Sequence, residues 1–152
     1  MNNEKEVLLE VSDLKKHFTM KNKKIIKAVD GVSFSIAKGE TLGLVGESGC
    51  GKTTCGRTAI GLYAPTSGKT LYRGKEIHSL KGAERKAFTK DVQVVFQDPY
   101  SSLDPKMRVI DIVSEGLISH NLVSGNAEKK EAVQELLKLV GLRSEHATRY
   151  VH

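Results

Sequence analysis

Residues 46–53 read Gly46-Glu47-Ser48-Gly49-Cys50-Gly51-Lys52-Thr53 and match the pattern G-x-x-x-x-G-K-[ST] without a mismatch. Glycines in such a loop let the backbone curl until successive N–H groups point into one concavity, where they bind phosphate oxygens. A helix that begins at the loop adds its N-terminal amides and its dipole. The lysine reaches the β- and γ-phosphates, and the Ser or Thr hydroxyl binds Mg²⁺. The pattern therefore predicts a site for the phosphates of a nucleotide.

The residues on either side of this loop have the character that the motif requires. Residues 41–45 form a short run that is apolar on both faces, as in a strand buried in the middle of a sheet. Residues 52–62 are predicted to form a helix that ends near Gly61. The dinucleotide pattern G-x-G-x-x-G fails, because Thr54 stands where the third glycine is needed. A Rossmann-type cofactor site is therefore not expected.

Strands are predicted at three further places. Residues 7–12 and 32–37 follow the two-residue period of a half-buried strand, with apolar side chains at every second position. Residues 92–96 form another continuous apolar strand, which Pro99 brings to an end. The first two thirds of the chain therefore combine strands with a helix.

The last third of the chain has helical spacing instead. Apolar residues recur every three or four positions over residues 109–117 and again over residues 132–140. Asn126 is placed to cap the front of the second helix, and Gly141 is placed to cap its back. The order of the elements predicts an α/β chain with a helical tail.

Length and composition exclude several classes of protein. The chain has 152 residues, of which 39% are hydrophobic and 28% charged, which is typical of one globular domain with at most a small appendage. No stretch approaches the roughly 18 apolar residues of a membrane span, and the N-terminus has no apolar core of a signal peptide. The net charge of +6 is dispersed, and aromatic residues make up only 5%. Because stacking platforms for bases are scarce, no nucleic-acid partner is expected.

The two cysteines, Cys50 and Cys55, have no third or fourth partner for a zinc site or a disulfide framework. Cys50 lies inside the glycine-rich loop, where the N-terminus of a helix favours the thiolate. The five histidines are scattered along the sequence, so no pattern supports a nucleophile. We expect Cys50 to be a small loop residue whose side chain is turned away from the phosphates.

Three stretches together resemble the N-terminal part of the ATPases of ATP-binding-cassette (ABC) transporters, and most of all those of oligopeptide and dipeptide importers. They are residues 27–34 (KAVDGVSF), residues 44–54 (LVGESGCGKTT) and residues 95–105 (VFQDPYSSLDP). The last is the most specific, because many NTPases share the phosphate loop. The resemblance implies an α/β fold of the P-loop NTPase type, truncated, with an N-terminal antiparallel β region and the start of a helical subdomain. It implies a nucleotide-binding core at residues 1–97 and a helical part at residues 98–152.

The resemblance also implies roles for individual residues. Gln97 would sense the metal or the attacking water, and it would bind Mg²⁺ together with Thr53. Phe18 stands where the family places an aromatic ring that stacks on adenine, although it is equally typical of an ordinary core residue. The residues that would bind ATP are Gly46, Glu47, Ser48, Gly49, Cys50, Gly51, Lys52, Thr53, Thr54 and Phe18.

Partners and location follow from the same resemblance. Such ATPases work as head-to-tail pairs at the cytoplasmic face of the cell membrane, so a second ABC ATPase subunit is expected. The region Tyr100 to Met107 would contact the transmembrane permease subunits. The 152 residues contain no Ser-Gly-Gly signature, no apolar strand that ends in Asp-Glu and no switch histidine after it. We therefore expect the chain to stop before the half that does the chemistry, and to bind ATP without efficient hydrolysis.

Two alternatives remain at this stage. A compact soluble P-loop kinase or GTPase-like enzyme would use Asp98, after the apolar run at residues 92–96, to hold the metal. Gln97 and Pro99 on either side of Asp98 fit that hypothesis poorly. A non-catalytic nucleotide-binding remnant is the second alternative, and the intact pair Lys52 and Thr53 argues against long decay.

Overall fold

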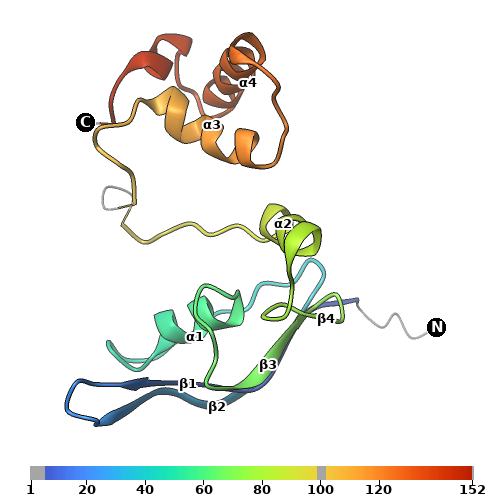
Figure 1. Ribbon diagram of the computed structural model, residues 1–152, viewed down its shortest axis with the longest axis vertical. Helices are drawn as coiled ribbons and strands as arrows, with labels where there is room; N and C mark the ends of the chain where they lie inside the picture. Colours follow the sequence, from blue (N-terminus) through green and yellow to red (C-terminus); the bar gives the residue numbers. More distant parts are fainter. Residues whose placement is uncertain (1–5, 99–101, 152) are drawn as a thin grey trace. The chain divides into compact units, whose positions relative to one another are not determined.

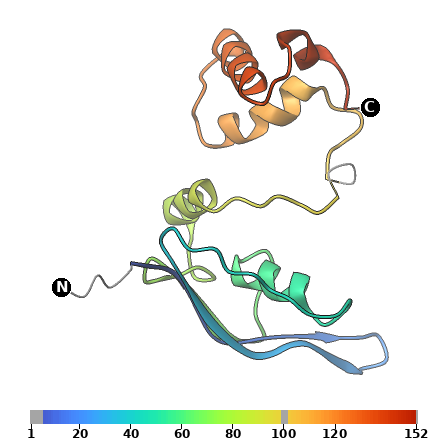
Figure 2. The ribbon, with the colours of Figure 1, turned by 180° about the vertical axis from the view of Figure 1, so that it is seen from behind.

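The computed structural model describes residues 6–98 and 102–151, and the chain forms two compact units (Figures 1 and 2). The first unit extends to Val92 and the second begins at Gln93. Tyr100, which begins the expected permease region, lies outside the described residues.

The first unit is built on an antiparallel sheet with the strand order β2-β1-β3-β4. The strands are β1 (Val7–Thr19), β2 (Ile25–Ala37), β3 (Ser67–Tyr72) and β4 (Lys75–Glu76). The expected antiparallel β region at the N-terminus is confirmed, and both of its strands are longer than the alternation indicates. Lys23, with φ of +62°, lies in the turn that joins them.

Helix α1 (Lys52–Ala59) covers one face of this sheet (Figure 1). Val11 and Leu14 of β1 are buried against Ala59 of the helix, with Leu9 and Phe34 packed around them. In a regular strand, Val11 and Leu14 would point to opposite faces of the sheet, because they are three residues apart. The pairing of β1 with β2 shifts its register between these two residues. Such an irregularity re-aims a side chain, which explains how both enter the core.

The remaining helix of the first unit is α2 (Gly82–Asp91). Its Phe88 is buried and lies edge to face with Tyr72 of β3, with the ring centres 5.4 Å apart. Ile77, directly after β4, is also fully buried. Aromatic packing between Phe88 and Tyr72 therefore holds α2 against β3.

Two predicted strands do not form. Residues 41–45 and residues 92–96 have no strand structure, and Val45 and Val95 are 92% and 98% exposed. An apolar run of this kind is buried only when strands flank it and helices cover both faces. Within the described residues the sheet ends at β2 and β4, and neither run pairs with it. The prediction of buried strands there was wrong for this structure.

The second unit is helical, with α3 (Val109–Ser119), α4 (Asn126–Leu139) and the short 3₁₀ helix η1 (Ser144–Thr148). Its core combines residues from all three elements, with Val133, Leu137 and Ala147 buried and Val109, Ile110, Val113 and Leu117 packed against them. Both predicted helices are confirmed.

The ends of α4 differ in how well the sequence predicts them. Asn126 is the first helical residue and does not cap the helix, because Gly125 occupies the capping position. Gly141 has φ of +77°, and the amide of Leu142 donates to the carbonyl of Leu137 at 2.9 Å. This is the left-handed glycine ending that the sequence indicates. No helix among the described residues is long and apolar enough to cross a bilayer.

Candidate nucleotide-binding site

The loop at residues 46–51 has the backbone that a phosphate cradle needs. Gly49 has φ of +79° and Gly51 has φ of +97°, both in the left-handed region that favours glycine. Gly51 is the N-cap of α1, so no side chain caps this helix, and its first turn holds no acidic residue. The first amides of a helix have no partner within the helix. Here they are available to an anion, with the positive end of the helix dipole behind them.

Strand β2 passes very close to this loop. A Cβ atom built on Gly51 would lie 2.1 Å from the carbonyl oxygen of Ala28. The pairing of β1 with β2 is irregular at the same place, because Val29 pairs with Lys16 whereas Lys27 pairs with His17. Ala28 is therefore an extra residue in β2, as in a β-bulge. Only glycine at position 51 permits this approach, which fixes the loop against the sheet.

Lys52 curls back over the loop. Its ammonium donates to the carbonyl oxygens of Gly46 at 2.9 Å and of Glu47 at 2.6 Å, and lies 3.7 Å from the Cys50 sulfur. All these contacts are exposed to solvent. An ammonium in this position can exchange its carbonyl partners for phosphate oxygens at little cost, because neither side leaves a buried polar group unpaired.

A pocket of about 390 Å³ opens between the loop and β2. This volume is within the usual range for a small-molecule site, roughly 300–1,000 Å³. It is lined by Ile26, Lys27, Ala28, Gly49, Cys50, Gly51, Lys52, Thr53 and Thr54. The lining holds two cations and no carboxylate, so the pocket favours an anionic ligand.

The predicted site residues are brought together only in part. Six of them line this pocket, from Gly49 to Thr54, whereas Glu47 and Ser48 lie exposed in the loop beside it. Phe18 is 38% exposed near the end of β1, where its ring meets Tyr63 edge to face at 6.1 Å. Gln97 is exposed and belongs to the second unit.

The two cysteines differ in their surroundings. Cys50 is exposed in the loop, and it also lines the pocket, whereas Cys55 is 6% exposed on the face of α1 that packs on the sheet. Burial raises the pKa of the Cys55 thiol. Of the two, Cys50 therefore lies where a bound nucleotide can cover it. Its sulfur lies 3.7 Å from the Lys52 ammonium, so the expectation of a side chain turned away from the phosphates is not met.

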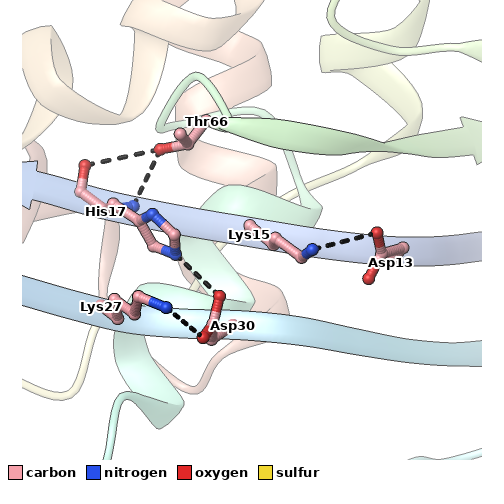
Figure 3. A network of polar contacts seen from close by, with 6 residues as sticks. All are labelled: Asp13, Lys15, His17, Lys27, Asp30 and Thr66. Carbon is pink, nitrogen blue, oxygen red and sulfur yellow. Dashed lines mark hydrogen bonds and ion pairs between the residues drawn. The ribbon is translucent and has the colours of Figure 1, made fainter.

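Sequence reasoning missed a polar network beside the pocket (Figure 3). Asp30 of β2 accepts hydrogen bonds from Lys27 at 3.1 Å and pairs with the His17 ring of β1 at 2.9 Å. These two partners hold the pKa of the Asp30 carboxyl below its usual range, with the His17 bond the larger cause. His17 also donates its backbone N–H to the hydroxyl of Thr66 at 2.8 Å. The separation of His17 from Asp30 in the sequence gives no signal of this contact, which depends on strand register.

Comparison with known proteins gives the family. The model of the ABC transporter family matches residues 29–151, and the chain belongs to this family. The chain is 51% identical over 148 residues to the oligopeptide transport ATP-binding protein OppF of Bacillus subtilis, covering 97% of this chain and 48% of the relative. It is 46% identical over 151 residues to the dipeptide transport ATP-binding protein DppF of Lactococcus lactis, covering 98% of this chain and 48% of that protein.

Solved structures agree with this family. A dimeric bacterial ABC transporter cassette is similar, with a TM-score of 0.73 and 25% identity, over 94% of this chain and 61% of that chain. An ATP-binding cassette solved with ADP and phosphate gives a TM-score of 0.76 at 23% identity, over 95% of this chain and 62% of that chain, which shows the fold. The expected ABC ATPase fold is confirmed. The chain spans about half the length of the curated relatives that it matches.

Proposed function

We propose that this chain supplies the ATP-binding site of an ABC importer subunit that takes up peptides or similar small solutes. The phosphate loop at residues 46–53 carries the proposal, since it combines left-handed glycines, uncapped helix amides and a lysine held over the loop. The names of the OppF and DppF relatives support peptides as the solute. Coupling of ATP hydrolysis to uptake belongs to the whole protein and is part of this proposal.

The residues of the proposed site have separate tasks in this function. The amides at the start of α1 bind phosphate oxygens, and Lys52 moves from the loop carbonyls to the β- and γ-phosphates. The Thr53 hydroxyl is exposed at the second position of α1 and fits a Mg²⁺ ligand, because Mg²⁺ prefers oxygen donors. Gln97 is the proposed second contact to the metal or to the attacking water. Phe18 is the proposed platform for adenine.

The proposed assembly is a pair of ABC ATPase subunits joined head to tail on the permease subunits, at the cytoplasmic face of the membrane. The region Tyr100 to Met107 is the proposed permease contact, and part of it lies outside the described residues. The core at residues 1–97 would hold the nucleotide, and residues 98–152 would belong to the helical subdomain. The dimeric cassette among the solved structures supports the pairing.

The 152-residue chain should bind ATP and hydrolyse it at or near the background rate. Phosphoryl transfer needs a group that positions the attacking water, and loss of one positioning or charge-stabilising group commonly costs orders of magnitude in rate. The 152 residues hold no Ser-Gly-Gly signature and no Asp-Glu strand end. A phosphate-release assay with saturating Mg²⁺ tests this. Turnover of roughly 1–100 s⁻¹ that Lys52→Ala abolishes would contradict the proposal and favour a compact kinase.

Two substitutions separate the importer subunit from that alternative. In a compact kinase or GTPase-like enzyme, Asp98 holds the metal, so Asp98→Asn should remove metal-dependent binding. In the ABC ATPase, Gln97→Ala should weaken the response to Mg²⁺ more than Asp98→Asn does. Titration of ATP with and without Mg²⁺ against both variants measures the difference. A larger loss in Asp98→Asn would favour the kinase.

A further inference from the structure

We propose that Lys27 is a second cation for the phosphates of the bound nucleotide. In the absence of nucleotide, the Lys27 ammonium pairs with Asp30. This inference rests on the proposed function, because it names a further binding residue of the same site. Lys27 lies in β2, outside the phosphate-loop motif, and nothing in its sequence position marks it as a ligand residue.

The position of Lys27 follows from contacts of the backbone. Its neighbour Ala28 presents the carbonyl that only a glycine at position 51 can approach, so β2 is fixed against the start of α1. Lys27 then lines the same pocket as Lys52, Thr53 and Thr54. A triphosphate carries more negative charge than one Mg²⁺ and one ammonium neutralise. Lys27 is the second cation of this lining. The lining itself holds no carboxylate, and the carboxylate that pairs with Lys27 is that of Asp30.

The ion pair with Asp30 explains how Lys27 can be released. The ammonium lies 3.1 Å from Oδ2 of Asp30, whereas the His17 ring lies 2.9 Å from Oδ1 of the same carboxylate (Figure 3). When Lys27 leaves, Asp30 keeps the bond with His17 and is not left unpaired. The Lys27 side chain is 62% exposed, so the ion pair that it gives up is screened by water. Exchange of the carboxylate for a phosphate therefore costs little.

Equilibrium binding of Mg·ATP to the purified chain tests the inference. Lys27→Ala should weaken binding roughly three- to tenfold, as expected for loss of one partly exposed charge-assisted contact, and Lys27→Arg should preserve it. The deficit of Lys27→Ala should shrink at high salt, because the contact is exposed. Lys24→Ala is the matched control, since Lys24 is an exposed lysine near the start of β2 that does not line the pocket.

Asp30→Asn should not weaken nucleotide binding, in contrast to Lys27→Ala. It frees Lys27 in the empty pocket, so binding should be unchanged or tighter. If Asp30→Asn weakens binding as much as Lys27→Ala does, the pair acts on structure and the inference is overturned. Wild-type affinity in Lys27→Ala also overturns it, while loss of binding in Lys52→Ala would keep the proposed function intact. Absence of binding to the wild-type chain would instead reject the proposed function.

Discussion

At the scale of single residues, Gly51 meets two requirements at once. Its φ of +97° is a conformation that other residues rarely adopt, and its missing side chain leaves room for the carbonyl of Ala28. The motif predicts the first requirement from sequence. The second depends on an irregularity in the pairing of β2, which no pattern in the sequence reveals.

Gly51→Ala should therefore destabilise the first unit by about 1–3 kcal/mol from backbone strain alone, with more from the clash, and should abolish nucleotide binding. Gly56→Ala is the matched control, because Gly56 lies inside α1 with nothing within 4 Å of its added Cβ. That change should stabilise the helix by about 0.5–1 kcal/mol. Denaturant unfolding measures both, and equal stability of the two variants would show that the loop does not have this backbone.

The cysteines give a chemical readout of the pocket. Cys50 should react with a maleimide, and saturating Mg·ATP should shield it, because the thiol lines the pocket beside Lys52. Cys55 should react slowly in both conditions, since it is buried and its raised pKa lowers the thiolate fraction. Mass mapping of the adducts measures this. Equal labelling of Cys50 with and without nucleotide would place the nucleotide elsewhere.

At the scale of elements, the sequence predicts what is local and misses what depends on neighbours. Helices α3 and α4 have apolar periodicity, and α1 follows the phosphate-loop motif, which requires a helix after it. The left-handed Gly61 and Gly141 mark two of the helix ends, so all three helices could be predicted. The runs at residues 41–45 and 92–96 have the composition of buried strands, but strand formation needs a paired neighbour as well as apolar side chains. Whether a paired strand lies next to these residues depends on the rest of the fold, and the sequence of the run itself does not reveal it.

The contact between α3 and α4 provides a pH-dependent prediction. Lys129 donates to Asp111 at 2.8 Å and lowers the pKa of that carboxyl, with this hydrogen bond as the main cause. A lowered pKa in the folded state stabilises the unit above the ordinary Asp value of about 3.9, and this contribution is lost as the pH falls through the lowered pKa.

Lys129→Ala should consequently lower the melting temperature at neutral pH, and the difference from the wild-type chain should shrink as the pH falls through the lowered pKa of Asp111. Lys130→Ala, an exposed neighbour in α4, should show no such dependence. Thermal unfolding across the acid range, followed by circular dichroism, compares the two. A pH-independent difference between Lys129→Ala and the wild-type chain would assign its effect to packing instead.

At the scale of the whole molecule, each unit has a core of its own. The first unit buries Val11 and Leu14 against Ala59 of α1, and the second packs α3, α4 and η1 around Val133 and Leu137. The phosphate loop lies in the first unit, whereas Gln97 belongs to the second. The loop could be predicted residue by residue, because its function constrains its sequence directly. The network of His17 and Asp30 could not, because strand register alone brings it together.

The central claim is that residues 46–54 bind the phosphates of a nucleotide. The most direct test compares the melting temperature of the wild-type chain and of Lys52→Ala, each with and without Mg·ATP. A ligand at about ten times its Kd adds roughly 1.4 kcal/mol, or about 3–6 °C for a chain of this size. We predict this shift for the wild-type chain and its near loss in Lys52→Ala, which lacks the ammonium now bonded to Gly46 and Glu47. Equal shifts in the two proteins would contradict the claim.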